Sequence, residues 1–178
     1  MPFNLLVTQC FLQGTAFEDT GDSPRISVSP DKTREKIIFF RIDEDGDTNS
    51  PFRIAYNMNH DGERICDLII YYKNLNTGEQ YLVLTETKGT DFDRSADQLI
   101  NTYQKMGLKT CLIRKRYCDN LNVKLCCVSK KINKITLTSA KQAKGKIIEK
   151  VKIDKNNCAF VDPFNFIRFL RGEKIPTI

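Results

Sequence analysis

The chain has 178 residues, of which 40% are hydrophobic and 28% are charged, values typical of one folded domain with a substantial core. No stretch approaches roughly 18 consecutive apolar residues, which excludes a membrane span from the sequence pattern. The apolar N-terminal segment has no basic region before it, which argues against a secretory signal, so we expect a cytoplasmic protein.

Cysteine and histidine usage excludes several kinds of site. The seven cysteines include no Cys-x-x-Cys pair, which disfavours structural zinc and indicates reduced, mostly buried thiols. Cys126 and Cys127 lie in an apolar run, and we expect them to pack in the core. The one histidine, His60, is expected in a solvated loop. Metal sites built from several histidines are therefore excluded.

Charge is distributed unevenly along the chain. Residues 1–104 hold 10 Lys and Arg against 17 Asp and Glu, a net charge of −7. Residues 105–155 hold 15 against 3, a net charge of +12. Such a basic region fits either a surface that contacts a polyanion, nucleic acid being one candidate, or a well-solvated lysine-rich face.

The N-terminal third predicts a helix and two strands separated by loops. Apolar positions in 3–17 are compatible with an opening helix, and 21–32 is rich in turn residues. The run EKIIFFRI (35–42) predicts a strand that an acidic turn ends. A further strand is predicted at FRIAYNM (52–58), followed by the loop NHDGER (59–64).

The middle of the chain predicts a β-hairpin followed by a helix. ICDLIIYY (65–72) and YLVLTETKG (81–89) are rich in β-branched and aromatic residues, and Asn, Thr and Gly lie between them. In DRSADQLINTYQKMG (93–107) the apolar positions follow helical spacing. Ser95 and Gln98 have the spacing of a capping box, and the final glycine suits the helix end.

The C-terminal part predicts one more strand and two helices. NVKLCCVSK (122–130) has the pattern of a strand, and a less regular segment at 108–117 is a candidate helix. SAKQAKGKIIEKV (139–151) predicts a basic helix interrupted by Gly145, and DPFNFIRFLRG (162–172) predicts an amphipathic helix. This order of elements fits an α/β sandwich around a mixed sheet.

Strand geometry brings three charged side chains of the hairpin together. Glu86 and Lys88 point to the same face because side chains alternate with a period of two. If Tyr72 pairs with Tyr81, Asp67 lies opposite Glu86 on that face. A register shifted by one residue would separate them, so the hairpin register tests the prediction.

Two opposed carboxylates repel each other, and a bound cation would compensate that repulsion. Magnesium needs only one or two carboxylates, because it keeps several of its waters. The alternative is an ion-pair triad in which Lys88 bridges Asp67 and Glu86. The Glu-Thr-Lys triplet alone has no weight, since chance produces such triplets in a chain of this composition. Its position beside Asp67 at the end of an apolar strand favours catalysis.

At these residues the chain resembles the PD-(D/E)xK nuclease superfamily. The Asp of CDLII, the E-T-K of LVLTETKG and the following helix DRSADQLINTYQ match, over about 65–128, with Cys66 where the family has proline. The resemblance implies a restriction-endonuclease-like α/β sandwich with a central mixed β-sheet flanked by helices. It implies a single nuclease-like domain over 1–178, with its catalytic core at about 52–130.

The resemblance also implies roles for individual residues. Asp67, Glu86 and the main-chain carbonyl of Thr87 would be ligands of Mg²⁺ or Mn²⁺, and Lys88 would be the catalytic lysine. Some members place a Gln and a Tyr on the following helix. Gln98 and Tyr103 are weak candidates here, since they lie five residues apart instead of four.

Many members take a further acid from the first helix. Glu18 is the natural candidate for that acid in this chain, and Asp19 and Glu35 compete with it.

The expected function is metal-dependent hydrolysis of phosphodiester bonds, with DNA preferred over RNA as substrate. A homodimer would provide two sites for cutting two strands, but no sequence feature requires one. The alternatives are a non-catalytic nucleic-acid-binding or regulatory protein with the nuclease fold, and an interaction protein with an internal salt bridge. Phosphate contacts are expected from lysines of the basic region: Lys130, Lys131, Lys134, Lys141 and Lys144.

Overall fold

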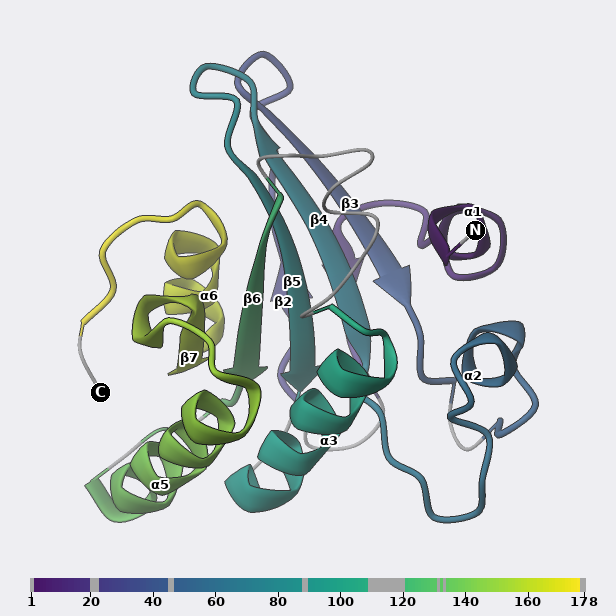
Figure 1. Cartoon of the computed structure of the whole chain (residues 1–178). Coiled ribbons are helices and arrows are strands. Elements are labelled where there is room, and N and C mark those ends of the chain that lie inside the picture. The colour runs from purple at the N-terminus through teal and green to yellow at the C-terminus, as the bar shows by residue number, and fades with distance from the viewer. Residues whose placement is uncertain are drawn as a thin grey trace.

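A central five-stranded sheet organises the chain (Figure 1). The structure is a computed structural model, and it describes residues 2–19, 23–44, 47–87, 90–108, 121–130, 132 and 134–176. The sheet order is β3-β4-β5-β6-β7, and two short strands form a separate pair, β1-β2. None of the helices within these residues is long and apolar enough to cross a membrane.

The sheet is mixed, antiparallel in one half and parallel in the other. Strands β3 (Glu35–Arg41), β4 (Leu68–Asn74) and β5 (Gln80–Thr87) are antiparallel neighbours. Strand β6 (Leu121–Val128) runs parallel to β5, and β7 (Cys158–Val161) runs parallel to β6. The predicted α/β class with a mixed sheet is confirmed at this level.

Helices and the short strand pair cover the two faces of the sheet. Helices α3 (Phe92–Lys105) and α5 (Lys134–Val151) pack on one face, where side chains such as those of Leu82 and Leu84 form the larger core. Helix α6 (Pro163–Leu170) covers the other face together with the strand pair. Successive side chains of β5 alternate between these two cores, Leu82 and Leu84 in one and Tyr81 and Val83 in the other, so each side chain can be assigned to a face.

The first third of the chain differs from the prediction. Helix α1 (Pro2–Gln9) is shorter than the predicted helix 3–17, and β1 (Ala16–Phe17) lies within the predicted range and pairs with β2 (Ile26–Ser27). The predicted strand 52–58 is instead helix α2 (Pro51–Ala55).

Helix α2 forms because a capping residue and a proline set its first turn. The side chain of Ser50 accepts a hydrogen bond from the N–H of Arg53, and Pro51 occupies the first helical position. Arg53 itself is buried and lies 2.7 Å from a carboxylate oxygen of Asp43. The segment 52–58 resembles a strand in its apolar content, and its arginine gives no sign in the sequence of being buried in a helix.

Later elements agree better with the sequence pattern. The hairpin, β6 and the helices α3 and α6 are confirmed, but α3 begins earlier than predicted. Its N-cap is Asp91, whose side chain accepts from Arg94 N–H, so Ser95 and Gln98 do not form the predicted capping box. Helix α5 continues through Gly145 without interruption, and β7 was not predicted. The candidate helix at 108–117 lies largely outside the described residues.

Candidate functional site

The hairpin has the register that the sequence predicts. Tyr72 pairs with Tyr81, and the last residues paired at the open end of the hairpin are Leu68 and Thr85. If this register continues by one residue on each strand, Asp67 lies beside Glu86. The hairpin pattern thus brings two carboxylates to the carboxyl end of β5, and the predicted register is confirmed.

Asp67 is bound to the backbone of the neighbouring strand. Its Oδ2 accepts hydrogen bonds from the N–H of Thr87 at 2.7 Å and from the Thr87 hydroxyl at 2.6 Å. Asp67 is only 6% exposed. Because β4 begins at Leu68, this side chain takes the place of a backbone acceptor at the end of the strand pair. Asp67 therefore has a structural role in addition to any catalytic one.

Glu86 is fully buried, with 0% of its surface exposed. Leu84 and Leu82 precede Glu86 by two and four residues, so all three side chains point to the same face of the sheet, the face that α3 and α5 cover. Burial raises the pKa of the Cys66 thiol well above its ordinary value, and the nearby negative charges of Glu86 and Asp67 raise it further. Both carboxylates thus lie close enough to raise the pKa of the same buried thiol, so the two acids share one environment from which water is largely excluded.

The main-chain carbonyl of Thr87 lies at the same end of the sheet. It accepts a hydrogen bond from the hydroxyl of Ser23 at 3.4 Å, a long and therefore weak contact. Ser23 was not predicted as part of the site, and no sequence signal connects a loop residue to a strand 64 positions later.

These groups provide the oxygen donors that magnesium or manganese prefers, two carboxylates and one carbonyl. The described residues contain no group of three or more His, Cys, Asp or Glu side chains that could hold a metal. A metal would therefore depend on Asp67, Glu86, the Thr87 carbonyl and water. That donor set fits Mg²⁺, which keeps several waters when bound to proteins.

Polar residues of α3 hold the segment that leads into Asp67. Gln98 Nε2 donates to the carbonyl of Ile65 at 2.8 Å, and the hydroxyl of Thr102 accepts from the N–H of Cys66 at 2.9 Å. Gln98 thus anchors the segment that precedes Asp67, and Thr102 was not predicted as part of the site. Tyr103, the other weak candidate on this helix, is buried in the core.

The candidates for a further acid separate clearly in the structure. Glu18 is not on the first helix, because α1 ends at Gln9; it follows β1 and is exposed. Glu35 is buried and accepts two hydrogen bonds from Arg171, at 2.7 and 3.1 Å. Asp19 lies 4.0 Å from Arg41, the last residue of β3.

Since Arg41 pairs with Leu68, Asp19 is located at the same end of the sheet as Asp67. The prediction that the first helix supplies Glu18 is therefore wrong, because the chain has already left the helix before that residue.

The predicted basic residues are distributed over different places. Lys130 is exposed and follows β6, whose end lies beside Thr87, so it shares this end of the sheet. Lys141 and Lys144 line a cavity elsewhere in the molecule. Lys88, Lys131 and the side chain of Lys134 lie outside the described residues.

Comparison with known proteins adds no relative. No protein-family model, curated protein or solved structure matches the chain. The geometry of Asp67 and Glu86 and the resemblance of the motif are therefore the grounds for a function.

Proposed function

We propose that the chain is a metal-dependent nuclease of the restriction-endonuclease-like kind, which hydrolyses phosphodiester bonds. The observation that carries the proposal is the hairpin register, which brings Asp67 beside Glu86 at the carboxyl end of β5. A mixed sheet with helices on both faces is compatible with that fold. Two carboxylates and a main-chain carbonyl at one strand end are the oxygen donors that a divalent cation prefers.

Each residue of the site has a distinct task in this proposal. Glu86 and Asp67 would hold Mg²⁺ or Mn²⁺ together with the Thr87 carbonyl, and the hydrogen bonds from Thr87 orient the Asp67 carboxylate. When bound, the metal would supply Lewis-acid stabilisation of charge on the phosphate. Lys88, two residues after Glu86, would orient the attacking water and neutralise charge on the phosphorus centre.

DNA is the preferred substrate of the proposal, because a basic region follows the site. Lys130 lies at the same end of the sheet and is free of any ion pair within the described chain, so it is available to a backbone phosphate. Contacts of this type give affinity that falls with salt and does not depend on sequence.

One observation favours a second candidate, a nucleic-acid-binding protein without catalysis. Asp67 closes the end of the strand pair through Thr87, and that role needs no metal.

The test is cleavage of plasmid, linear and single-stranded DNA and of RNA, each with Mg²⁺ or Mn²⁺. We expect cleavage by the wild-type chain and a loss of at least about 100-fold in Glu86→Gln, Lys88→Ala and Asp67→Asn. The asparagine keeps an acceptor for Thr87, so this variant separates catalysis from folding. Asp61→Asn, an exposed loop position, is the matched control and should keep full activity.

Two results would contradict a nuclease. One is the absence of cleavage by the wild-type chain with every substrate and metal, and binding without cleavage would then support the second candidate. The other is cleavage that persists in both Glu86→Gln and Asp67→Asn, which would show that the activity does not depend on the proposed site.

A further inference from the structure

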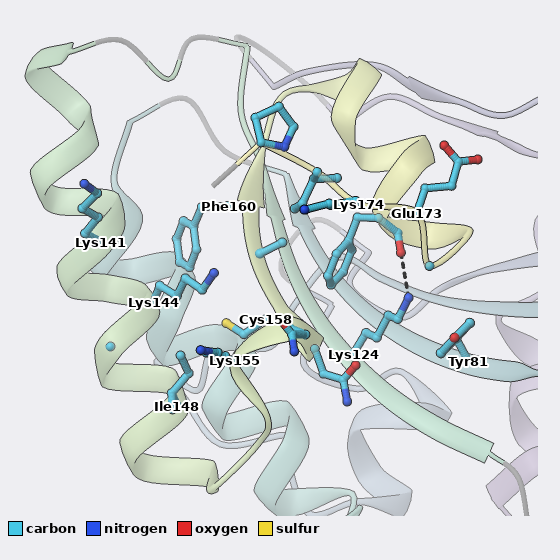
Figure 2. Close-up of a pocket in the computed structure, with 18 residues that line it drawn as sticks. Tyr81, Lys124, Lys141, Lys144, Ile148, Lys155, Cys158, Phe160, Glu173 and Lys174 are labelled. Atoms are coloured by element: carbon cyan, nitrogen blue, oxygen red, sulfur yellow. Dashed lines mark hydrogen bonds between the residues drawn. The ribbon is translucent and has the colours of Figure 1, made fainter. Parts of the chain in front are cut away.

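A cavity of about 760 Å³ opens at the edge of the sheet, apart from Asp67 and Glu86. Strand β7 pairs only with residues 125–128 of β6, so in the described chain residues 121–124 have no strand on their outer side. The cavity lies beside this half of β6, between α5 and the segment after α6 (Figure 2). Tyr81 lines it and precedes Glu86 by five residues, roughly 17 Å along β5.

The cavity is strongly basic. Within the described chain, no carboxylate oxygen lies within 4.0 Å of the ammonium group of any lysine that lines it. Among the described residues that line the cavity, Glu173 is the one acid, and its carboxylate lies 3.6 Å from Arg168. Figure 2 shows Lys141 and Lys144 on α5 at one side, with Lys124 on the sheet at the other. The lining lysines come from four segments of the chain: Lys124, Lys141, Lys144, Lys155 and Lys174.

Lys124 is the buried member of this set, with only 3% of its surface exposed. Its ammonium group donates to the main-chain carbonyl of Phe169 at 2.7 Å and lies 3.6 Å from the centre of the Tyr81 ring. An ammonium group has three N–H donors, and the carbonyl takes one of them. Burial of a cation among neutral groups is costly, and an anion in the cavity would offset that cost.

The volume and the walls indicate more than a simple anion. About 760 Å³ is in the range of small-molecule sites and far exceeds the space of one phosphate ion. Apolar side chains form part of the lining, among them Ile148, Phe160 and Phe169. We propose that this cavity binds a phosphorylated small molecule of nucleotide size, with its phosphates at the lysines and its organic part against the apolar wall. This site is separate from the proposed nuclease centre and needs no metal.

The test is isothermal titration calorimetry of the full chain with ATP and AMP in the presence of EDTA. Inorganic phosphate and adenosine are the comparison ligands. We expect saturable nucleotide binding at least about tenfold tighter than either comparison ligand, and a loss of at least about tenfold in Lys144→Gln and Lys124→Met. Lys150→Gln is the matched control, because Lys150 is an exposed residue of α5 outside the cavity.

Lys144 is only half buried, so its variant tests the site even if Lys124→Met folds poorly. Four results would overturn the proposal: no nucleotide binding at millimolar concentration, phosphate binding as tight as nucleotide binding, equal losses in Lys150→Gln, or binding of long oligonucleotides only. Asp67→Asn leaves the cavity intact, so nucleotide binding in that variant would persist even if the chain has no nuclease activity.

Discussion

The buried ammonium group of Lys124 should make the stability of the chain depend on pH in a measurable way. Burial lowers the pKa of Lys124 to about 8, from an ordinary value of 10.5. Between these two values the unfolded chain binds more protons than the folded chain. The contribution of Lys124 to the free energy of unfolding therefore increases as the pH rises through this window.

The two pKa values fix the size of this effect. Proton linkage gives a gain of about 1.3 kcal/mol from pH 7 to pH 9 and about 2.5 kcal/mol from pH 7 to pH 10. Buried thiols act in the opposite direction, since burial raises the pKa of Cys158 to about 12 and that of Cys126 well above its ordinary value. The effect of Cys158 is common to the wild-type chain and to Lys124→Met, so it cancels in the difference. The charge of Lys124 lowers the pKa of Cys126, so this pKa rises further in the variant and adds to the relative gain of the wild-type chain.

The assay is urea unfolding of the wild-type chain and Lys124→Met under reducing conditions at pH 7, 8, 9 and 10. The wild-type chain should gain stability relative to the variant by the amounts above, and Lys150→Met should show no such trend. A difference between wild type and Lys124→Met that stays within about 0.5 kcal/mol over this range would refute the reasoning. A bound nucleotide should weaken the trend, because an anion favours the charged lysine.

Two further predictions concern buried polar contacts. Burial alone would raise the pKa of Glu35, but hydrogen bonds from Arg171 and from the Asp31 N–H outweigh it and lower the pKa. Arg171→Met should therefore lower the free energy of unfolding by about 1.5–3 kcal/mol at pH 7, and by less as the pH falls through the pKa of Glu35. Urea unfolding of the wild-type chain and the variant at pH 7 and pH 3 measures this loss. An equal loss at both pH values would contradict the ion pair. Thr102→Val removes the acceptor of the buried Cys66 N–H and should cost about 1–3 kcal/mol, whereas Thr102→Ser should cost less. Equal unfolding midpoints for the valine and serine variants would contradict that role.

The hairpin could be predicted because its information is local. β-branched and aromatic residues fill both strands, turn residues separate them, and pairing Tyr72 with Tyr81 fixes every other pair. The approach of Asp67 to Glu86 follows from that register alone. Helix α3 could be predicted equally well, since its apolar positions repeat with helical spacing over 14 residues.

Contacts between distant segments could not be predicted. The hydrogen bond from Ser23 to the Thr87 carbonyl and the contacts of Gln98 and Thr102 with 65–66 depend on how loops and helices pack on the sheet. Strand β7 has only four residues, too few for a recognisable pattern. Helix α2 was missed although Ser50 and Pro51 are local signals of a helix start, because the apolar residues around its buried arginine were interpreted as a strand.

The two carboxylates of the site differ in whether they would be kept for folding or for the proposed catalysis. Asp67 binds both the N–H and the hydroxyl of Thr87, so a descendant that had lost catalysis would still be under selection to keep it for folding. Glu86 is a fully buried acid inside a strand whose neighbour on the same face, Leu84, is apolar, and the proposed function is what would keep an acid there. Under the proposed nuclease function, loss of the glutamate among relatives would mark loss of activity, while retention of the aspartate would mark only retention of the sheet.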